Sequence, residues 1–152
     1  DNTTLFEYLQ ACWEELGVQT VLTPTEPAAM TELRDAGKFD ITNQNWGADY
    51  FDASNMLSIF KTGHFINAGK YSNEAFDKAY DDAMVCVDNT ERMELLHEAE
   101  RILVEEDMGI IPLFYGATVV LYDEDVCSNV IFDANGLVQF QNVVVTNGAA
   151  SK

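Results

Sequence analysis

The chain has 152 residues, 47% of them hydrophobic, which is enough for one compact domain with a core of its own. Asp and Glu number 26 against 8 Lys and Arg, and the resulting net charge of −18 disfavours nucleic acid and anionic membrane surfaces as partners. The three cysteines, Cys12, Cys86 and Cys127, fit no zinc-binding spacing and permit at most one internal disulfide. No metal ion and no cofactor is expected.

The N-terminal stretch, DNTTLFEYLQACWEEL, carries neither the basic nor the apolar region of a signal peptide, so we expect it to lie inside a domain. Apolar residues at helical spacing predict a first helix over residues 4–16, which Gly17 ends. Thr4 and Glu7 have the spacing of a capping box at its start.

Two strands and a helix are expected next. Residues 18–22 are typical of a short strand, Thr25 is placed to cap a helix that Gly37 follows, and residues 39–46 are typical of a second strand. This alternation predicts a parallel pair of strands with a helical crossover, and hence an α/β layer.

The middle of the chain is predicted to be helical. A short helix is expected over residues 53–60, followed by a loop over residues 61–72 that contains two glycines and one asparagine. The clearest helical periodicity covers residues 76–87. Asp88 has the position of a cap for a longer helix that runs to about residue 107, and the two long helices are expected to be neighbours.

The last part of the chain is expected to form strands. Residues 110–114 and 118–122 are rich in β-branched and aromatic residues, and Pro112 indicates an edge strand or the start of a strand. Residues 126–145 hold further short apolar runs of uncertain type. One α/β lobe over residues 1–145 and a disordered tail over residues 146–152 are therefore predicted.

Residues 44–57, QNWGADYFDASNML, bring aromatic side chains and carboxylates together where a predicted strand gives way to a loop. Asp52 is placed to cap the helix that follows, with a ligand role as the alternative. Asp49 has no such structural task, and it is either a solvated loop residue or a ligand group at the carboxyl end of a parallel strand. Trp46 and Tyr50 are either core residues or surfaces on which a ligand stacks.

Two further classes of function stay open at this point. The pair Asp49 and Asp52 could act as the acid and base of a glycoside hydrolase. Exposed aromatic residues around Tyr50 would instead suit a protein-interaction domain. Motifs of nucleophilic or phosphoryl-transfer enzymes are absent from the sequence.

The run WGADYFDASNML is followed by a loop with Asn67, then YSNEAFDKAYDDA, the helix RMELLHEAERILVEED and the strand IIPLFYG. The order of these motifs resembles the C-terminal part of the solute-binding proteins of oligopeptide and dipeptide ABC importers, the family 5 extracellular solute-binding proteins. Upstream, LFEYLQACWEELGV is similar to the family's helix that ends in Leu-Gly before a strand. The resemblance covers about residues 4–122, although Phe51 and Ala53 stand where the family has prolines.

The resemblance implies the fold of one lobe of a two-lobed periplasmic-binding protein of type II, in which a mixed sheet is flanked by helices. The chain would then be a fragment of a larger protein, with the other lobe as its partner. In the family, an Asp in the place of Asp49 pairs with the α-ammonium of a peptide, and an aromatic residue in the place of Trp46 lines a side-chain pocket. Gly47, Ala48 and Tyr50 complete the ligand-binding loop that the resemblance implies.

The function implied is that of a bacterial binding protein without enzymatic activity. It would capture extracellular peptides and deliver them to an ABC permease in the membrane. Its expected location is the periplasm or the outer face of the cell membrane, held there as a lipoprotein. The same family includes binding proteins for nickel chelates, haem or sugars, so a non-peptide ligand stays the alternative.

Overall fold

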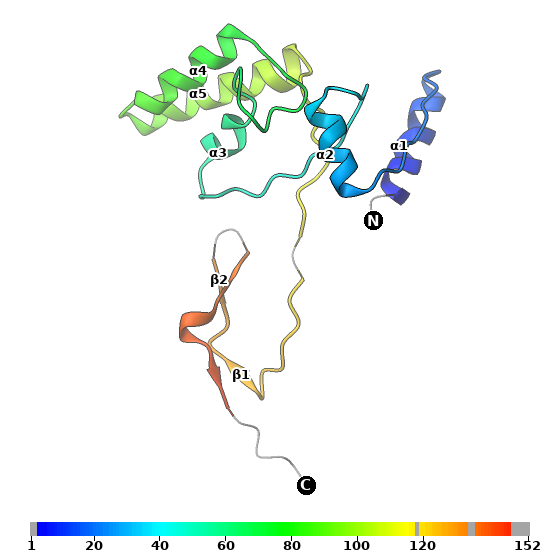
Figure 1. Ribbon diagram of the computed structural model, residues 1–152. Helices are drawn as coiled ribbons and strands as arrows, with labels where there is room; N and C mark the ends of the chain where they lie inside the picture. The colour runs from blue at the N-terminus through cyan, green and yellow to red at the C-terminus, as the bar shows by residue number, and fades with distance from the viewer. Residues whose placement is uncertain (1–2, 118, 134–135, 147–152) are drawn as a thin grey trace. The chain divides into compact units, whose positions relative to one another are not determined.

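The computed structural model describes residues 3–117, 119–133 and 136–146. The chain divides into two compact units, Asp1–Thr42 and Asn43–Lys152, which are coloured along the chain in Figure 1. That both belong to the single lobe expected for residues 1–145 stays a prediction. Of the expected tail, residues 147–152 lie outside the described part of the chain, and the backbone N–H of Thr146 donates to the carbonyl of Val126 at 2.9 Å.

The first unit consists of two helices, α1 (Thr3–Glu15) and α2 (Pro27–Asp35). Gly17 and Gly37 follow them with φ of 82° and 64°, so each helix ends at a glycine in the left-handed conformation, as the sequence predicts. No helix among the described residues has the length and apolar character needed to cross a membrane.

The caps expected for these two helices differ from those found. Thr4 lies inside the first turn of α1, because the helix already includes Thr3. Glu26, and not Thr25, occupies the N-cap position of α2, and Pro27 starts the helix because its fixed φ suits the first turn. The hydroxyl of Thr25 donates instead to the carbonyl of Thr23.

The second unit begins with three α-helices, α3 (Ala53–Ser58), α4 (Glu74–Val85) and α5 (Asn89–Arg101). A short π-helical segment, η1 (Ile102–Glu106), continues α5. Each α-helix begins at a capping side chain that accepts backbone N–H groups, supplied in chain order by Asp52, Asn73 and Asp88. The prediction for this part of the chain is therefore confirmed for all three helices and for the caps Asp52 and Asp88.

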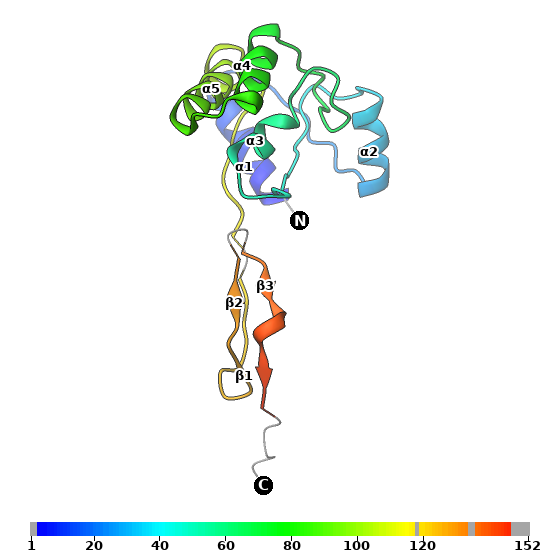
Figure 2. The ribbon, with the colours of Figure 1, turned by 90° about the vertical axis from the view of Figure 1, so that its left-hand side faces the viewer.

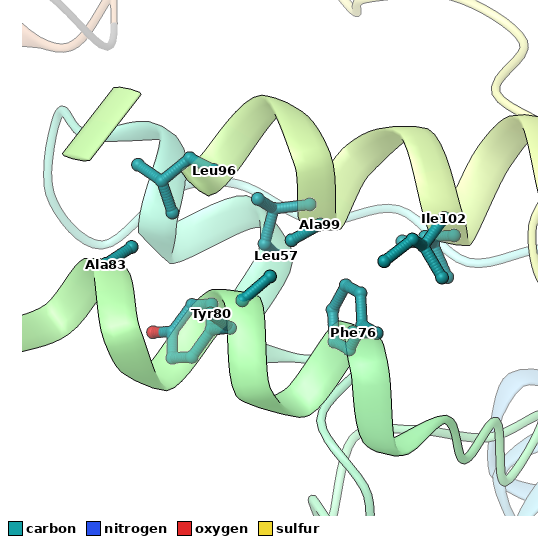
Figure 3. Close-up of a cluster of buried hydrophobic side chains, with 9 residues drawn as sticks. Leu57, Phe76, Tyr80, Ala83, Leu96, Ala99 and Ile102 are labelled. Carbon is teal, nitrogen blue, oxygen red and sulfur yellow. The ribbon is translucent and has the colours of Figure 1, made fainter. Parts of the chain in front are cut away.

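The core lies between α3, α4, α5 and η1. Figure 3 shows apolar side chains of these helices pointing toward one another, with Phe76 and Tyr80 on α4, Leu96 on α5 and Leu57 on α3. Phe76 and Leu96 are fully buried. Val87 is wholly exposed, contrary to the predicted periodicity, because α4 ends at Val85 and the turn to α5 carries it out of the core.

The described strands follow the helices and pair in two antiparallel ribbons, seen in Figure 2. In one ribbon, β1 (Cys127–Ser128) pairs with β4 (Val144–Val145). In the other, β2 (Ile131–Phe132) pairs with β3 (Val138–Gln139), and the 3₁₀ turn η2 (Phe140–Asn142) leads on to β4. The described residues of the uncertain region 126–145 thus include four short strands and a 3₁₀ turn.

The strands expected earlier in the chain are not found in the described residues. The segments 18–22, 39–46, 110–114 and 119–122 form no paired strand, and Thr118 lies outside the described part. The parallel pair with a helical crossover is likewise not found, since both described ribbons are antiparallel. A strand exists only where a neighbouring strand satisfies its N–H and C=O groups. Several apolar residues of these segments are exposed, including Val21 and Leu121.

Candidate ligand-binding site

The loop from Trp46 to Asp52 ends where Asp52 caps α3. Its Oδ1 accepts the backbone N–H of Ser54 at 2.9 Å. The guanidinium of Arg92, near the start of α5, donates to both carboxylate oxygens at 3.0 and 2.7 Å. These bonds, chiefly those from Arg92 and then that from Ser54, hold the pKa of Asp52 well below its usual value. The cap predicted from the sequence is confirmed, and the carboxylate is already paired.

The pairing of Asp52 with Arg92 argues against its use as the acid of a glycoside hydrolase. A general acid must hold a proton near the working pH, usually because its pKa is raised. The pKa of Asp52 is lowered instead, since its partners stabilise the ionised form. Asp52 therefore does not hold the proton that the general acid of such a pair must supply.

Asn55 joins two of the predicted site residues. Its side chain is 3% exposed and belongs to α3. The amide oxygen Oδ1 accepts the indole Nε1–H of Trp46 at 3.0 Å and the backbone N–H of Asp49 at 3.1 Å. Trp46 and Asp49 are therefore held beside each other by one buried acceptor.

The carboxylate of Asp49 is exposed to solvent. Its one side-chain contact of hydrogen-bond length among the described residues comes from Nδ2 of Asn55 at 3.5 Å, which is at the outer limit for such a bond. The carboxylate thus retains most of its accepting capacity for another donor. Trp46 is half-buried, so part of the indole is available beside it.

The remaining predicted residues lie in the same loop. Gly47 is exposed, and a Cβ built there would meet no atom within 4 Å, so this side of the loop is open. Ala48 is half-buried. Tyr50 is 49% exposed, and its hydroxyl lies 3.3 Å from Oγ of Ser54. The structure therefore places all five residues on one loop, with an exposed anion, part of an indole and a phenol ring.

Sequence reasoning missed two residues that organise this loop. One feature of the sequence could have indicated Asn55. It is a polar residue two positions before Leu57, on a short helix that must bury one face. No local pattern could have indicated Arg92, because 40 positions separate it from Asp52. Within the described ranges, no group of three or more His, Cys, Asp or Glu side chains is arranged to hold a metal ion.

The fold was compared with solved structures. A solved structure described as the peptide-binding protein of a peptide ABC transporter superimposes with a TM-score of 0.67 at 29% identity. The match covers 74% of this chain and 51% of that one. The expectation of a lobe of the type II binding-protein fold is thereby confirmed.

Sequence comparisons give the family. The model of one protein family matches residues 1–67, a range that includes the site loop. This family is described as "Bacterial extracellular solute-binding proteins, family 5 Middle". The oligopeptide-binding protein OppA of Salmonella typhimurium is 33% identical over 104 residues, which are 68% of this chain and 19% of OppA. The probable deoxycholate-binding periplasmic protein YgiS of Escherichia coli is 31% identical over 114 residues, which are 74% of this chain and 21% of YgiS.

The chain belongs to the family 5 bacterial extracellular solute-binding proteins. It spans about a fifth of the length of the curated relatives that it matches. The resemblance inferred from the order of the sequence motifs is confirmed.

Proposed function

We propose that this chain is part of a binding protein that captures peptides outside the cell and delivers them to an ABC permease. The observation that carries the proposal is the exposed carboxylate of Asp49, which Asn55 holds beside the indole of Trp46. An anion next to an aromatic surface suits a ligand with an ammonium group and an adjoining side chain. A peptide N-terminus has both.

The ligand-binding loop of the proposal comprises Trp46, Gly47, Ala48, Asp49 and Tyr50. Asp49 pairs with the α-ammonium, Trp46 and Tyr50 contact the first side chain, and the open side at Gly47 lets the peptide backbone approach. The other lobe of the full-length protein closes over the ligand and excludes water, which strengthens the ammonium pair. The protein releases its ligand unchanged, and its place is the periplasm or the outer face of the membrane, where a lipid anchor holds it.

The names of the two relatives offer different ligands, an oligopeptide for OppA and deoxycholate for YgiS. Deoxycholate carries a carboxylate, which the charge of Asp49 would repel. The net charge of −18 adds to this repulsion. Charge therefore favours the peptide over the bile salt.

The test is native mass spectrometry of the full-length protein that carries this sequence, purified without denaturation. A series of bound masses that match short peptides is the expected result, and it also gives the length preference. A single mass that matches a bile salt, a metal chelate, haem or a sugar would replace the peptide as the ligand. A protein that arrives empty and ignores an added peptide pool would contradict capture of peptides, and turnover of glycosides would contradict a purely binding role.

A further inference from the structure

The buried amide of Asn55 is the feature from which the arrangement of the site follows. We propose that Asn55 is a positioning residue, which fixes the Asp49 carboxylate and the Trp46 indole as one unit and thereby makes the site selective for a ligand with a free ammonium group. This inference rests on the proposed function. It assigns to Asn55 a role in ligand selectivity in addition to its place in the fold.

The orientation of the amide is determined by its neighbours. Trp46 Nε1–H and the backbone N–H of Asp49 are donors only, so the atom that faces them must be the amide oxygen. The two lone pairs of that oxygen are then both used by the site loop. The NH₂ group is left to face Oδ2 of Asp49, at 3.5 Å.

The helix that carries Asn55 is itself held in place. Asp52 ties its first turn to Arg92 on α5, and the carbonyl of Asn55 accepts the hydroxyl of Ser58 at 2.8 Å. Leu57, two residues on, belongs to the core formed with α4 and α5. Asn55 therefore transmits the position of a packed helix to an exposed loop, which is how binding groups are kept in a fixed geometry.

The residue type matters because each half of the amide has a different task. A leucine has a similar shape, but it would leave the N–H groups of Trp46 and Asp49 without their acceptor. The NH₂ group faces the Asp49 carboxylate at the outer limit of hydrogen-bond length and does not satisfy it, so a ligand ammonium still finds an acceptor. A loop whose backbone is already held at Asp49 loses less conformational freedom when the ligand binds.

The experiment uses the full-length protein with Trp46 and Asp49 intact. Asn55→Leu removes both halves of the amide, and Asn55→Ser is a smaller polar change that serves if the leucine variant does not fold. Asn67→Leu is the matched control, because Asn67 is also buried and its amide donates to the carbonyls of Phe60, Lys61 and Tyr71 in a different loop. All variants are compared for thermal stability.

Calorimetry then measures Kd for one peptide with a free N-terminus and for the same peptide acetylated there. The wild type is expected to prefer the free peptide. Asn55→Leu and Asn55→Ser are expected to reduce this preference by about tenfold or more. Asn67→Leu is expected to lower the melting temperature and to keep the preference. Folded Asn55 variants that keep the wild-type preference would overturn the proposal.

A second readout needs no ligand. With ¹⁵N-labelled tryptophan, the Nε1–H resonance that disappears in Trp46→Phe belongs to Trp46. We expect it to move upfield in both Asn55 variants, where its acceptor is lost, and to stay in place in Asn67→Leu. An unmoved resonance would overturn the positioning role even if peptides bind. A moved resonance in a protein that binds neither peptide would contradict the proposed function and leave the hydrogen bond established.

Discussion

Arg92 and Asp52 form a two-bond ion pair although 40 positions separate them in the chain. The pair joins the start of α5 to the start of α3, so the loop that carries the candidate site ends at a fixed point. Because the same carboxylate caps α3 through Ser54, one side chain stabilises both the helix and its attachment. The stability of this region should therefore depend on the ionisation of Asp52.

The first prediction concerns the stability of the protein at low pH. The pKa of Asp52 is lowered in the folded protein, so its contribution to the free energy of unfolding is present above the ordinary carboxyl pKa of about 4 and is lost as the pH falls through the lower folded value. Asn can still cap a helix, so Asp52→Asn isolates the loss of charge. Denaturant unfolding from about pH 7 to pH 2 should show wild type and variant differing most near neutrality and converging in acid. A difference that stays constant across this range would contradict the argument.

The second prediction compares two phenylalanines. Phe76 is fully buried between α4 and α5, whereas Phe65 is 88% exposed. Phe76→Ala leaves a cavity in the core and should cost about 3–5 kcal/mol of unfolding free energy. Phe65→Ala should change it by less than about 0.5 kcal/mol, because its ring is already in water. Denaturant titrations of both variants make the comparison, and equal losses would mean that the core is placed wrongly.

The third prediction concerns a close approach at the end of η1. A Cβ at Gly109 would lie 2.6 Å from Cδ2 of Tyr71 and 3.1 Å from Cδ1 of Leu103. The Tyr71 ring cannot turn away easily, because its hydroxyl donates to Asp107 at 2.7 Å. Gly109→Ala should therefore destabilise the protein by about 1–3 kcal/mol.

The control for this change is Gly69→Ala, where a Cβ would meet no atom within 4 Å. Thermal melts should leave this control close to wild type. A melting temperature for Gly109→Ala that equals that of Gly69→Ala would show that the contact with Tyr71 relaxes freely.

The helices of the second unit could be predicted because their signals are local. Asp88 stands directly before α5 and accepts the N–H groups of Thr90 and Glu91, both within three residues. The strands expected at 18–22 and 110–114 could not be predicted reliably from local signals. A strand depends on a partner elsewhere, and apolar alternation reports only that a segment is suited to pairing.

The same difference between local and long-range signals applies to the candidate site. The cap formed by Asp52 followed from its place before α3. The bonds of Asn55 to Trp46 and Asp49 span nine and six positions across a loop without regular structure, so no periodicity marks them. The loop residues themselves were found through the order of motifs in a family, which carries information that spacing alone lacks.

The last prediction tests the anchor in the full-length protein. Asp49→Asn removes the exposed negative charge but keeps the backbone N–H that donates to Asn55, so the loop should keep its shape. We expect affinity for a peptide with a free N-terminus to fall at least tenfold, about 1.4 kcal/mol, with little change in melting temperature. Calorimetry with the free and the acetylated peptide makes the measurement.

Glu100→Gln on α5 is the control for charge, since Glu100 is also exposed and the change removes the same single negative charge. If the long-range field of the acidic protein attracted the ligand, both variants would weaken binding alike, and added salt would weaken the wild type in the same way. A direct pair between Asp49 and the ammonium predicts a loss in Asp49→Asn alone, confined to the free peptide. Unchanged affinity in that variant would remove Asp49 from the site.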